Sequence, residues 1–334
     1  MEEMIRSFPD QINEQFNNLK SETFDSNLFK NIKSIVIAGM GGSAISGDLV
    51  RELLGSDLSV PFLVNRSHEL PFVDSRSLVV LCSYSGNTSE TLSCLDRARA
   101  AEARIVCITS GGELFETSRQ AGIPTALIPG GYPPRSAVGF SCGILQTLLH
   151  KLGVAPGPEG TAWQSWSRRQ ADDLSPERPL LQNRAKRLAA DLHGRIVIVY
   201  GVEGRTASVA RRWASQLAEN GKHLAYFSVI PEMNHNEIVG WKHPQDRLGG
   251  LVAVFLRDQK DHPEISRRID FTRRLLGGRA GRCLEISSEG SIWAERFWSL
   301  VLLGDFTSVY AGILNREDPT PVEVIDELKR NLEV

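Results

Sequence analysis

Residues 34–47 read SIVIAGMGGSAISG, and this stretch decides the fold. Its apolar run, residues 34–39, is rich in Ile and Val, as buried strands of parallel sheets are. A glycine-rich turn follows directly and leads into a helix. Residues 196–210, IVIVYGVEGRTASVA, repeat this order of strand, glycine turn and helix start in the second half of the chain. The sequence therefore predicts two copies of one α/β module.

Further apolar runs, separated by amphipathic helical segments, extend the prediction in each half. In the first half these runs are 61–66, 77–85, 104–110 and 125–131, and in the second half 224–231, 251–256 and 282–287. Buried strands joined by helices imply a parallel sheet covered on both faces. We expect two doubly wound domains, residues 1–152 and 167–334, joined by a linker at residues 153–166, where Pro and Gly gather.

The composition is that of an ordinary soluble globular protein. A chain of 334 residues exceeds the usual size of a single core, and 41% apolar with 23% charged residues is typical of globular proteins. The formal net charge of -2 excludes a large basic surface for nucleic acid. Five cysteines, none in a CxxC pair, indicate reduced thiols rather than a disulfide framework or a zinc site.

The apolar segments predict neither a signal peptide nor a membrane span. The first residues, MEEMIRSFPDQ, are acidic and have no apolar core. We take residues 251–256 as the longest apolar stretch, and it is far too short to cross a bilayer. We therefore expect a cytoplasmic protein that binds no membrane.

The turn after residue 39 can bind an anion, because glycines allow close approach and a helix N-terminus offers free N–H groups. Gly39, Gly41 and Ala44 also fit the dinucleotide fingerprint G-x-G-x-x-A. That fingerprint requires an acidic residue at the end of the next strand, where this chain has Asn65 and Arg66. An NADP-dependent oxidoreductase remains possible only through Arg66.

A second turn, SYSGNT at residues 83–88, places three hydroxyls where a strand meets a helix. Ser83, Ser85 and Thr88 can each donate a hydrogen bond to one phosphate. The alternative is a local turn in which these hydroxyls only cap the helix. Three hydroxyls that face a glycine-rich turn on the neighbouring strand favour an anion site.

At this point the sequence resembles known proteins. GMGGSAISGD and SYSGNTSETL resemble the sugar isomerase (SIS) fold, so the two modules are identified as SIS-type. GYPPRSAVGF, LAENGKHLAYFSVIPEMNHNEIVGW and DPTPVEVIDELKRNL resemble the bifunctional phosphoglucose/phosphomannose isomerases, and the likeness extends from SFPDQINEQF to the C-terminus. The resemblance implies that the sugar phosphate binds at Gly41, Gly42, Ser43, Ser83, Ser85 and Thr88.

Aldose–ketose isomerisation needs a base for a carbon-bound proton and a cation for the enediolate. Arg135 follows the rigid turn 131–134 and cannot lose its charge, although a solvated surface arginine is the alternative. Glu219 is predicted at a helix C-terminus, where the helix dipole favours the protonated form of a carboxylate. The chemistry alone leaves an exposed helix-end glutamate equally possible for Glu219, and the resemblance implies that it is the base. Should Glu219→Gln not impair proton exchange, Glu203 and Glu232 are the next candidates.

The resemblance also supplies the remaining groups. His235 would open the sugar ring, from the other subunit of a homodimer with a shared active site, and Lys329 would assist at the ring. Thr320 would make room for either epimer at C2, while the motif gives no individual role to Glu232, Asn236, Glu237 and Trp241. No His-x-x-x-His or similar cluster has metal-ligand spacing, so we expect neither a metal nor another cofactor, and exclude the zinc phosphomannose isomerases.

The expected function is metal-independent isomerisation of glucose 6-phosphate and mannose 6-phosphate to fructose 6-phosphate through a cis-enediol, in carbohydrate metabolism. One alternative is an isomerase that acts on glucose 6-phosphate alone. Another is a non-catalytic SIS module that senses a phosphosugar. Such a sensor would keep the hydroxyl turn, but it has no need of Glu219, Arg135 and His235 together.

Overall fold

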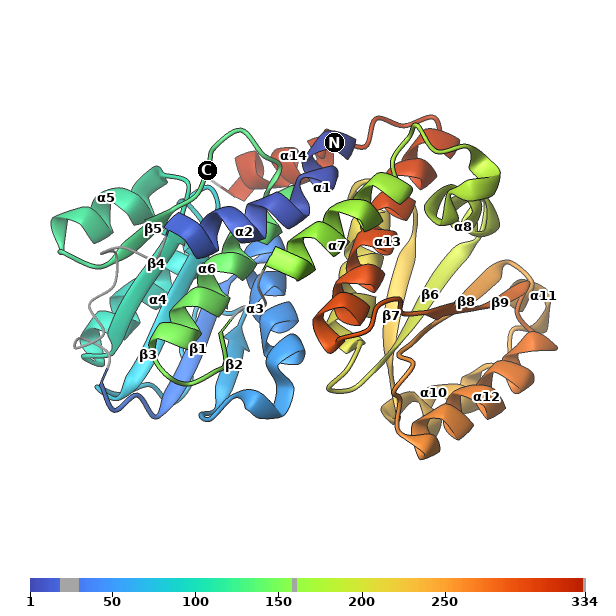
Figure 1. Ribbon diagram of the computed structural model, residues 1–334, viewed down its shortest axis with the longest axis horizontal. Coiled ribbons are helices and arrows are strands. Elements are labelled where there is room, and N and C mark those ends of the chain that lie inside the picture. The colour runs from blue at the N-terminus through green and yellow to red at the C-terminus, as the bar shows by residue number, and fades with distance from the viewer. Residues whose placement is uncertain (19–29, 158–160, 333–334) are drawn as a thin grey trace. The chain divides into compact units, whose positions relative to one another are not determined.

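The computed structural model describes residues 1–18, 30–157 and 161–332 (Figure 1). The chain forms two compact units, which we call the N-terminal unit, Arg6–Arg168, and the C-terminal unit, Met1–Ile5 with Arg169–Val334. Of the stretch 153–166, expected to link the halves, residues 158–160 lie outside the described residues, and helix α7 (Thr161–Asp173) begins within it.

The N-terminal unit is built on one parallel five-stranded sheet in the order β2-β1-β3-β4-β5. Its strands are β1 (Ser34–Gly39), β2 (Phe62–Asn65), β3 (Ser77–Ser83), β4 (Arg104–Thr109) and β5 (Thr125–Leu127). Its helices are α2 (Phe8–Asn18), α3 (Gly41–Leu54), α4 (Ser89–Ala100), α5 (Gly112–Gln120) and α6 (Val138–Lys151). Helix α1 (Glu2–Arg6) precedes them. All five strands lie within runs that the sequence predicted, because a strand buried on both faces needs Val and Ile along its whole length.

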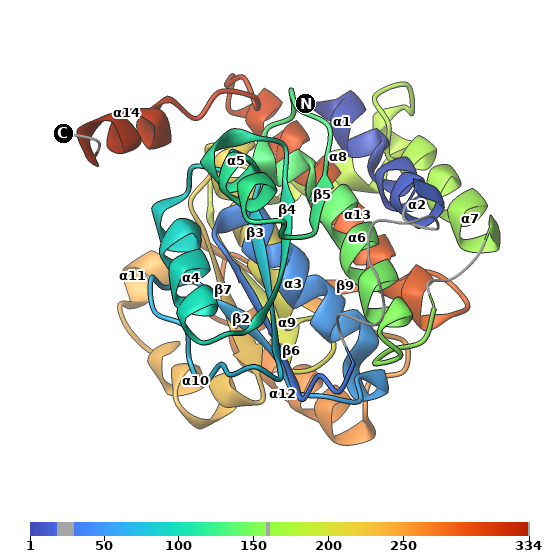
Figure 2. The same ribbon diagram turned by 90° about the vertical axis from the view of Figure 1, so that its left-hand side faces the viewer.

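Helices cover both faces of this sheet, as a doubly wound module requires. Figure 2 shows α4 and α5 on one side of the strands, and α3 and α6 on the other. The chain leaves β1 toward β2 on one side and returns to β3 on the other, so the strand order reverses between β1 and β3. Ligands of such sheets bind at the carboxyl ends of the two strands where the order reverses.

The C-terminal unit repeats this design with four parallel strands in the order β7-β6-β8-β9. The strands are β6 (Ile196–Val202), β7 (Ala225–Ile230), β8 (Leu251–Arg257) and β9 (Arg282–Ser287). The helices are α8 (Arg184–Leu192), α9 (Ala207–Glu219), α10 (Glu237–Gly240), α11 (Gln245–Leu248), α12 (Pro263–Gly277), α13 (Trp293–Leu314) and α14 (Glu323–Leu332). The prediction of two doubly wound α/β modules is therefore confirmed.

Helix α13 is a longer apolar segment than the one that the sequence analysis named. Its 22 residues are long and apolar enough to cross a membrane, and 89% of the apolar stretch is buried in the structure. It packs against α8 and α9, as the core helix of a globular unit does. The choice of residues 251–256 as the longest apolar stretch was wrong, because α13 is apolar on every face and gives no helical period.

Candidate active site

The glycine turn after β1 packs directly on the turn that carries Arg135. Met40 is extended, and Gly41, with φ of +49°, begins α3. A Cβ atom added at Gly42 would lie 2.6 Å from the carbonyl oxygen of Pro134, so only glycine fits there. The first anion loop and the arginine, 93 residues apart in sequence, therefore meet at the carboxyl edge of the sheet.

The hydroxyl turn after β3 lies beside this glycine turn, because β1 and β3 are neighbours. Ser83 is 2% exposed, and its Oγ is hydrogen-bonded to Thr88 Oγ1 at 2.8 Å. Thr88 occupies the N-cap position of α4, yet its side chain does not cap the helix. Ser83 and Ser85 do accept local bonds, from the N–H groups of Gly86 and Asn87. Thr88 therefore does not cap α4, as it would in the alternative of a purely local turn.

Gly86 fixes the hydroxyl turn against the next loop of the sheet. Its φ is +73°, and a Cβ atom there would lie 1.9 Å from the carbonyl oxygen of Gly111. Asn87 Oδ1 accepts a hydrogen bond from the backbone N–H of Glu113 at 2.9 Å. The turn is therefore held by its surroundings as well as by its own bonds.

Arg135 lies in a short 3-10 helix, Pro134–Ser136, and is 3% exposed. Tyr84, which the sequence analysis overlooked, ties this region to the hydroxyl turn. Its hydroxyl donates to the carbonyl oxygen of Pro129 at 2.9 Å and accepts from the N–H of Tyr132 at 2.8 Å. A tyrosine inside SYSG, at the end of a strand, was the only signal that could have indicated it.

All seven residues predicted to bind or stabilise the anion in this unit thus lie at one edge of one sheet. The edge carries the four hydroxyls of Ser43, Ser83, Ser85 and Thr88, the N-termini of α3 and α4, and the permanently charged residue Arg135. This is what a phosphate ester needs. By contrast, Arg66 forms an ion pair with the nearly buried Asp48, so the cation that kept the NADP alternative open is already neutralised.

Glu219 is the last residue of α9 and is half-buried. The next residue, Asn220, is fully buried and donates to Ser308 Oγ at 2.9 Å. Lys222 Nζ donates to the backbone oxygen of Glu219 at 2.7 Å and to that of Pro321 at 2.8 Å. These contacts fix the backbone at the helix end from which the Glu219 side chain extends.

His235 and Lys329 both have exposed side chains in the C-terminal unit. His235 ends a 3-10 helix, Glu232–His235, that follows β7, and Lys329 lies in α14. Neither side chain forms a hydrogen bond or an ion pair within the described residues. Among the residues that the structure describes, nothing therefore competes for these two groups.

The C-terminal unit does not bring Glu219 and His235 together. Because β6 and β7 are parallel, helix α9 between them runs back along the sheet, and Glu219 ends it at the amino edge of β7, just before that strand begins. His235 follows the carboxyl end of β7. Since a strand of six residues spans about 20 Å, the two side chains belong to opposite edges of one sheet.

At the position that corresponds to the hydroxyl turn, the C-terminal unit has a carboxylate. Asp258 directly follows β8, and Arg296, in the first turn of α13, donates to it at 2.7 Å. Ser288 Oγ donates to the same carboxyl at 2.8 Å, and Arg205, on the turn after β6, pairs with it. Burial opposes the ionisation of Asp258, but these hydrogen bonds outweigh it and hold its pKa below the ordinary value.

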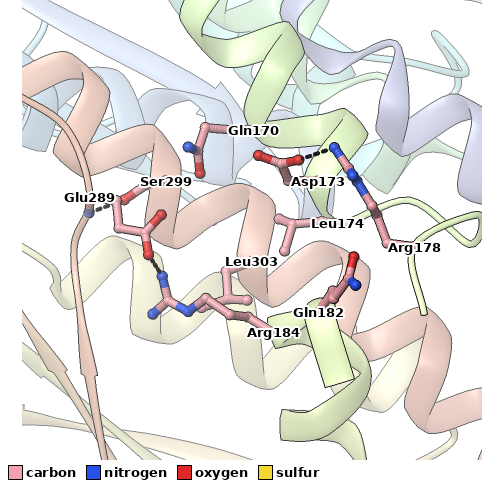
Figure 3. A pocket seen from close by; sticks show the side chains of 9 residues that line it. All are labelled: Gln170, Asp173, Leu174, Arg178, Gln182, Arg184, Glu289, Ser299 and Leu303. Carbon is pink, nitrogen blue, oxygen red and sulfur yellow. Dashed lines mark hydrogen bonds and ion pairs between the residues drawn. The ribbon is translucent and has the colours of Figure 1, made fainter. Parts of the chain in front are cut away.

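A polar pocket of about 330 Å³ also lies in the C-terminal unit (Figure 3). Its charged lining is self-neutralised, since Asp173 pairs with Arg178 and Arg184 with Glu289. It therefore has no spare cation for a phosphate, and we do not assign it to the site. Within residues 1–18, 30–157 and 161–332, no three His, Cys, Asp or Glu side chains gather as a metal site.

The fold and these turns define a class, the SIS-domain proteins. The family model of the SIS domain matches residues 28–116, and that of the bacterial phospho-glucose isomerase C-terminal SIS domain matches residues 181–332. The solved structure of tagatose-6-phosphate ketose/aldose isomerase from Escherichia coli has a TM-score of 0.68 at 17% identity, covers 95% of this chain and 93% of its own, and supports the fold alone.

The curated relatives specify the family within this class. The bifunctional phosphoglucose/phosphomannose isomerase of Caldicellulosiruptor bescii is 40% identical over 99% of this chain and 98% of its own. That of Aquifex aeolicus is 35% identical over 90% of each chain. The chain belongs to the bifunctional phosphoglucose/phosphomannose isomerase family.

Proposed function

We propose that the protein interconverts glucose 6-phosphate and mannose 6-phosphate with fructose 6-phosphate. The observation that carries the proposal is the full-length likeness to an enzyme named for both activities, at 40% identity. The carboxyl edge of the N-terminal unit supports it, because hydroxyls, helix N-termini and a buried arginine suit a sugar phosphate. In this proposal the phosphate binds at Gly41, Gly42, Ser43, Ser83, Ser85 and Thr88.

The proton transfer is assigned to Glu219. Its carboxylate takes the proton from C2 of the open-chain aldose and returns it to C1, so the ketose forms through a cis-enediol. The negative charge that develops on the sugar oxygens is stabilised by Arg135, which stays cationic throughout. Glucose and mannose differ only at C2, and that difference disappears in the planar enediol, so one site can serve both epimers.

Ring opening is assigned to His235, with Lys329 close to the ring. In this step the C1–O5 bond breaks, O5 gains a proton, and the C1 hydroxyl loses its proton as it becomes the carbonyl oxygen. An imidazole can carry a proton to O5 because its protonation changes near neutral pH. No metal and no other cofactor takes part in these steps.

We also propose that a second copy of the chain supplies His235. Within one chain Glu219 and His235 belong to opposite edges of the same sheet, about 20 Å apart, which exceeds the size of a hexose. One substrate can meet both groups if a two-fold dimer brings the His235 of one chain to the Glu219 of the other. The active sites of this homodimer would then be shared.

The test begins with purified protein assayed separately on glucose 6-phosphate and mannose 6-phosphate. Activity on glucose 6-phosphate alone would support the narrower isomerase, and binding without turnover would support a sensor. We then expect Glu219→Gln to lower kcat by at least about 10²-fold with little change in substrate affinity, because the amide cannot accept a carbon-bound proton. Exchange of the C2 proton with deuterated solvent should fall in parallel, since both processes pass through the enediol.

Glu203→Gln is the control, because Glu203 is another glutamate of the C-terminal unit, with an exposed side chain. It should retain nearly all activity. If Glu219→Gln kept normal solvent exchange while Glu203→Gln or Glu232→Gln lost it, the base would be a different glutamate, although the proposed substrates would stand.

A further inference from the structure

The segment that carries His235 is fixed to the core of the C-terminal unit at three points. Met233 is 1% exposed and packs in the core between the sheet and α12. Asn234 Nδ2 donates to the hydroxyl of a fully buried threonine of α12 at 2.8 Å. Glu237, two residues beyond His235, reaches back to Tyr200 on β6. The backbone that carries the exposed imidazole is therefore held in place by its neighbours.

The contact between Glu237 and Tyr200 involves two further aromatic side chains. Tyr200 is fully buried, stacks on Phe255 with ring centroids 4.8 Å apart, and donates to Glu237 Oε1 at 2.5 Å. Trp241 Nε1 donates to both partners, at 3.0 Å to the Tyr200 hydroxyl and at 3.3 Å to Glu237 Oε1. Burial first, and then Glu237, raise the pKa of Tyr200, so the phenol remains a donor at physiological pH.

This arrangement restrains His235 through the main chain. The side chain of His235 forms no bond of its own within the described part of the chain, so its direction depends on its backbone. Asn236 Oδ1 accepts the N–H of Glu237 at 2.5 Å, which stiffens the link between His235 and Glu237. Because His235 is only two residues from Glu237, a chain of at most about 7 Å, a shift of the Glu237 anchor also shifts the backbone that carries the imidazole. Proton transfer to a ring oxygen tolerates no such displacement.

We propose that Tyr200 and Glu237 are positioning residues that hold His235 for proton transfer to the ring oxygen. The inference rests on the proposed function, because it assumes that His235 opens the sugar ring. It also gives a role to Glu237 and Trp241, to which the sequence motif assigned none. Both residues would act through His235 and would not touch the substrate.

The test is a double-mutant cycle with kinetics on the cyclic sugar phosphate. Tyr200→Phe deletes only the hydroxyl, and Glu237→Gln keeps the shape of the side chain. Each should lower kcat about tenfold or more with an unchanged KM, because the phosphate is bound by other residues. In a His235→Ala background the same substitutions should cost less than about twofold, since a positioning residue has nothing left to position.

Tyr310→Phe is the matched control. It removes another buried phenol of the same unit, whose hydroxyl donates to the carbonyl oxygen of Leu174 at 2.7 Å. Its kcat should remain normal. Hydrogen exchange of the amides of residues 232–241 should speed up in Tyr200→Phe and not in Tyr310→Phe, and this reading needs no enzyme activity.

Equal losses with and without His235, or no loss in either variant, would show that the cluster only stabilises the fold. Unchanged exchange in Tyr200→Phe would refute the anchor itself. If the wild-type protein isomerises neither sugar phosphate, the proposed function fails, while the exchange experiment still decides whether the anchor exists.

Discussion

At the scale of single residues, the hydrogen bond between Ser83 and Thr88 shows how the phosphate would be recognised. Their hydroxyls lie 2.8 Å apart at the carboxyl end of β3 and satisfy one another. A phosphate that arrives there can accept a hydrogen bond from each of them. Because such bonds are charge-assisted, they are stronger than the bond between two hydroxyls that they replace.

We therefore expect Ser83→Ala with Thr88→Val to raise KM by about tenfold to a hundredfold and to leave kcat nearly unchanged. Steady-state kinetics on glucose 6-phosphate measure this directly. Ser118→Ala with Thr125→Val is the matched control, because it removes a second hydroxyl pair of the same unit, 2.8 Å apart, outside the proposed site. Equal KM values in the wild type and the first double variant would show that the phosphate does not bind at this turn.

At the scale of the elements, the cluster around Asp258 joins the turn after β6, the end of β8 and the start of α13. The side chain of Asp258 is fully buried, and that of Arg296 is 4% exposed. Since the pKa of Asp258 is lowered in the folded protein, its ionisation stabilises the fold at every pH above its ordinary value of 3.8. This stabilisation is lost as the pH falls below that value.

We expect Asp258→Asn to lower the free energy of unfolding at pH 7 by about 3 kcal/mol, because two arginines lose their buried partner. The deficit should shrink as the pH falls below 3.8, where the wild type loses the same charge. Urea unfolding at pH 7 and pH 3 measures both effects. Asp74→Asn is the control: its pair with Arg76 is exposed, so it should change little at either pH, and a pH-independent deficit in Asp258→Asn would contradict the account.

The elements also show what the sequence could and could not predict. All nine strands coincide with predicted runs to within one residue at their ends, because the central strands of each sheet are buried and rich in Val and Ile. Helix α13 was missed for a related reason: its residues are apolar on every side, so no amphipathic period marks it. Tyr84 and Asp258 act through partners that are distant in sequence, and only the folded sheet shows those partners.

The candidate site was predictable to a similar extent. The sequence could predict that the glycine turn after β1 and the hydroxyl turn after β3 lie close together, because parallel strands place their carboxyl ends at one edge. The contact of Gly42 with Pro134 was not, since no local pattern predicts which turn a distant arginine will meet. The proposed anchoring of His235 through Glu237 was likewise not predictable, because it depends on Tyr200, which lies on β6 and is distant in sequence.

At the scale of the whole molecule, a shared site makes a prediction about mixed dimers. Glu219→Gln and His235→Ala proteins, each inactive alone, should recover about a quarter of wild-type activity when their subunits exchange. The reason is statistical: half of the dimers are then mixed, and each mixed dimer holds one intact site. The measurement is activity against time after mixing, with exchange followed by a label on one variant.

The control mixture pairs Glu219→Gln with the double variant that carries both substitutions. No combination of these chains forms an intact site, so no activity should return. If exchange is complete and the first mixture also stays inactive, each chain must use its own His235, and the shared site is excluded.

The carboxylate of Asp258 has a consequence for how the protein responds to its surroundings. The C-terminal unit carries its own anion at the switch point of its sheet, whereas the N-terminal unit has hydroxyls there, where we propose that the phosphate binds. By mass action a ligand adds folding free energy only to the unit that binds it, in proportion to the logarithm of its concentration. The hydroxyl turn of the N-terminal unit would therefore gain stability only when the phosphate is bound, whereas the turn at Asp258 keeps its stabilising charge at any concentration of sugar phosphate.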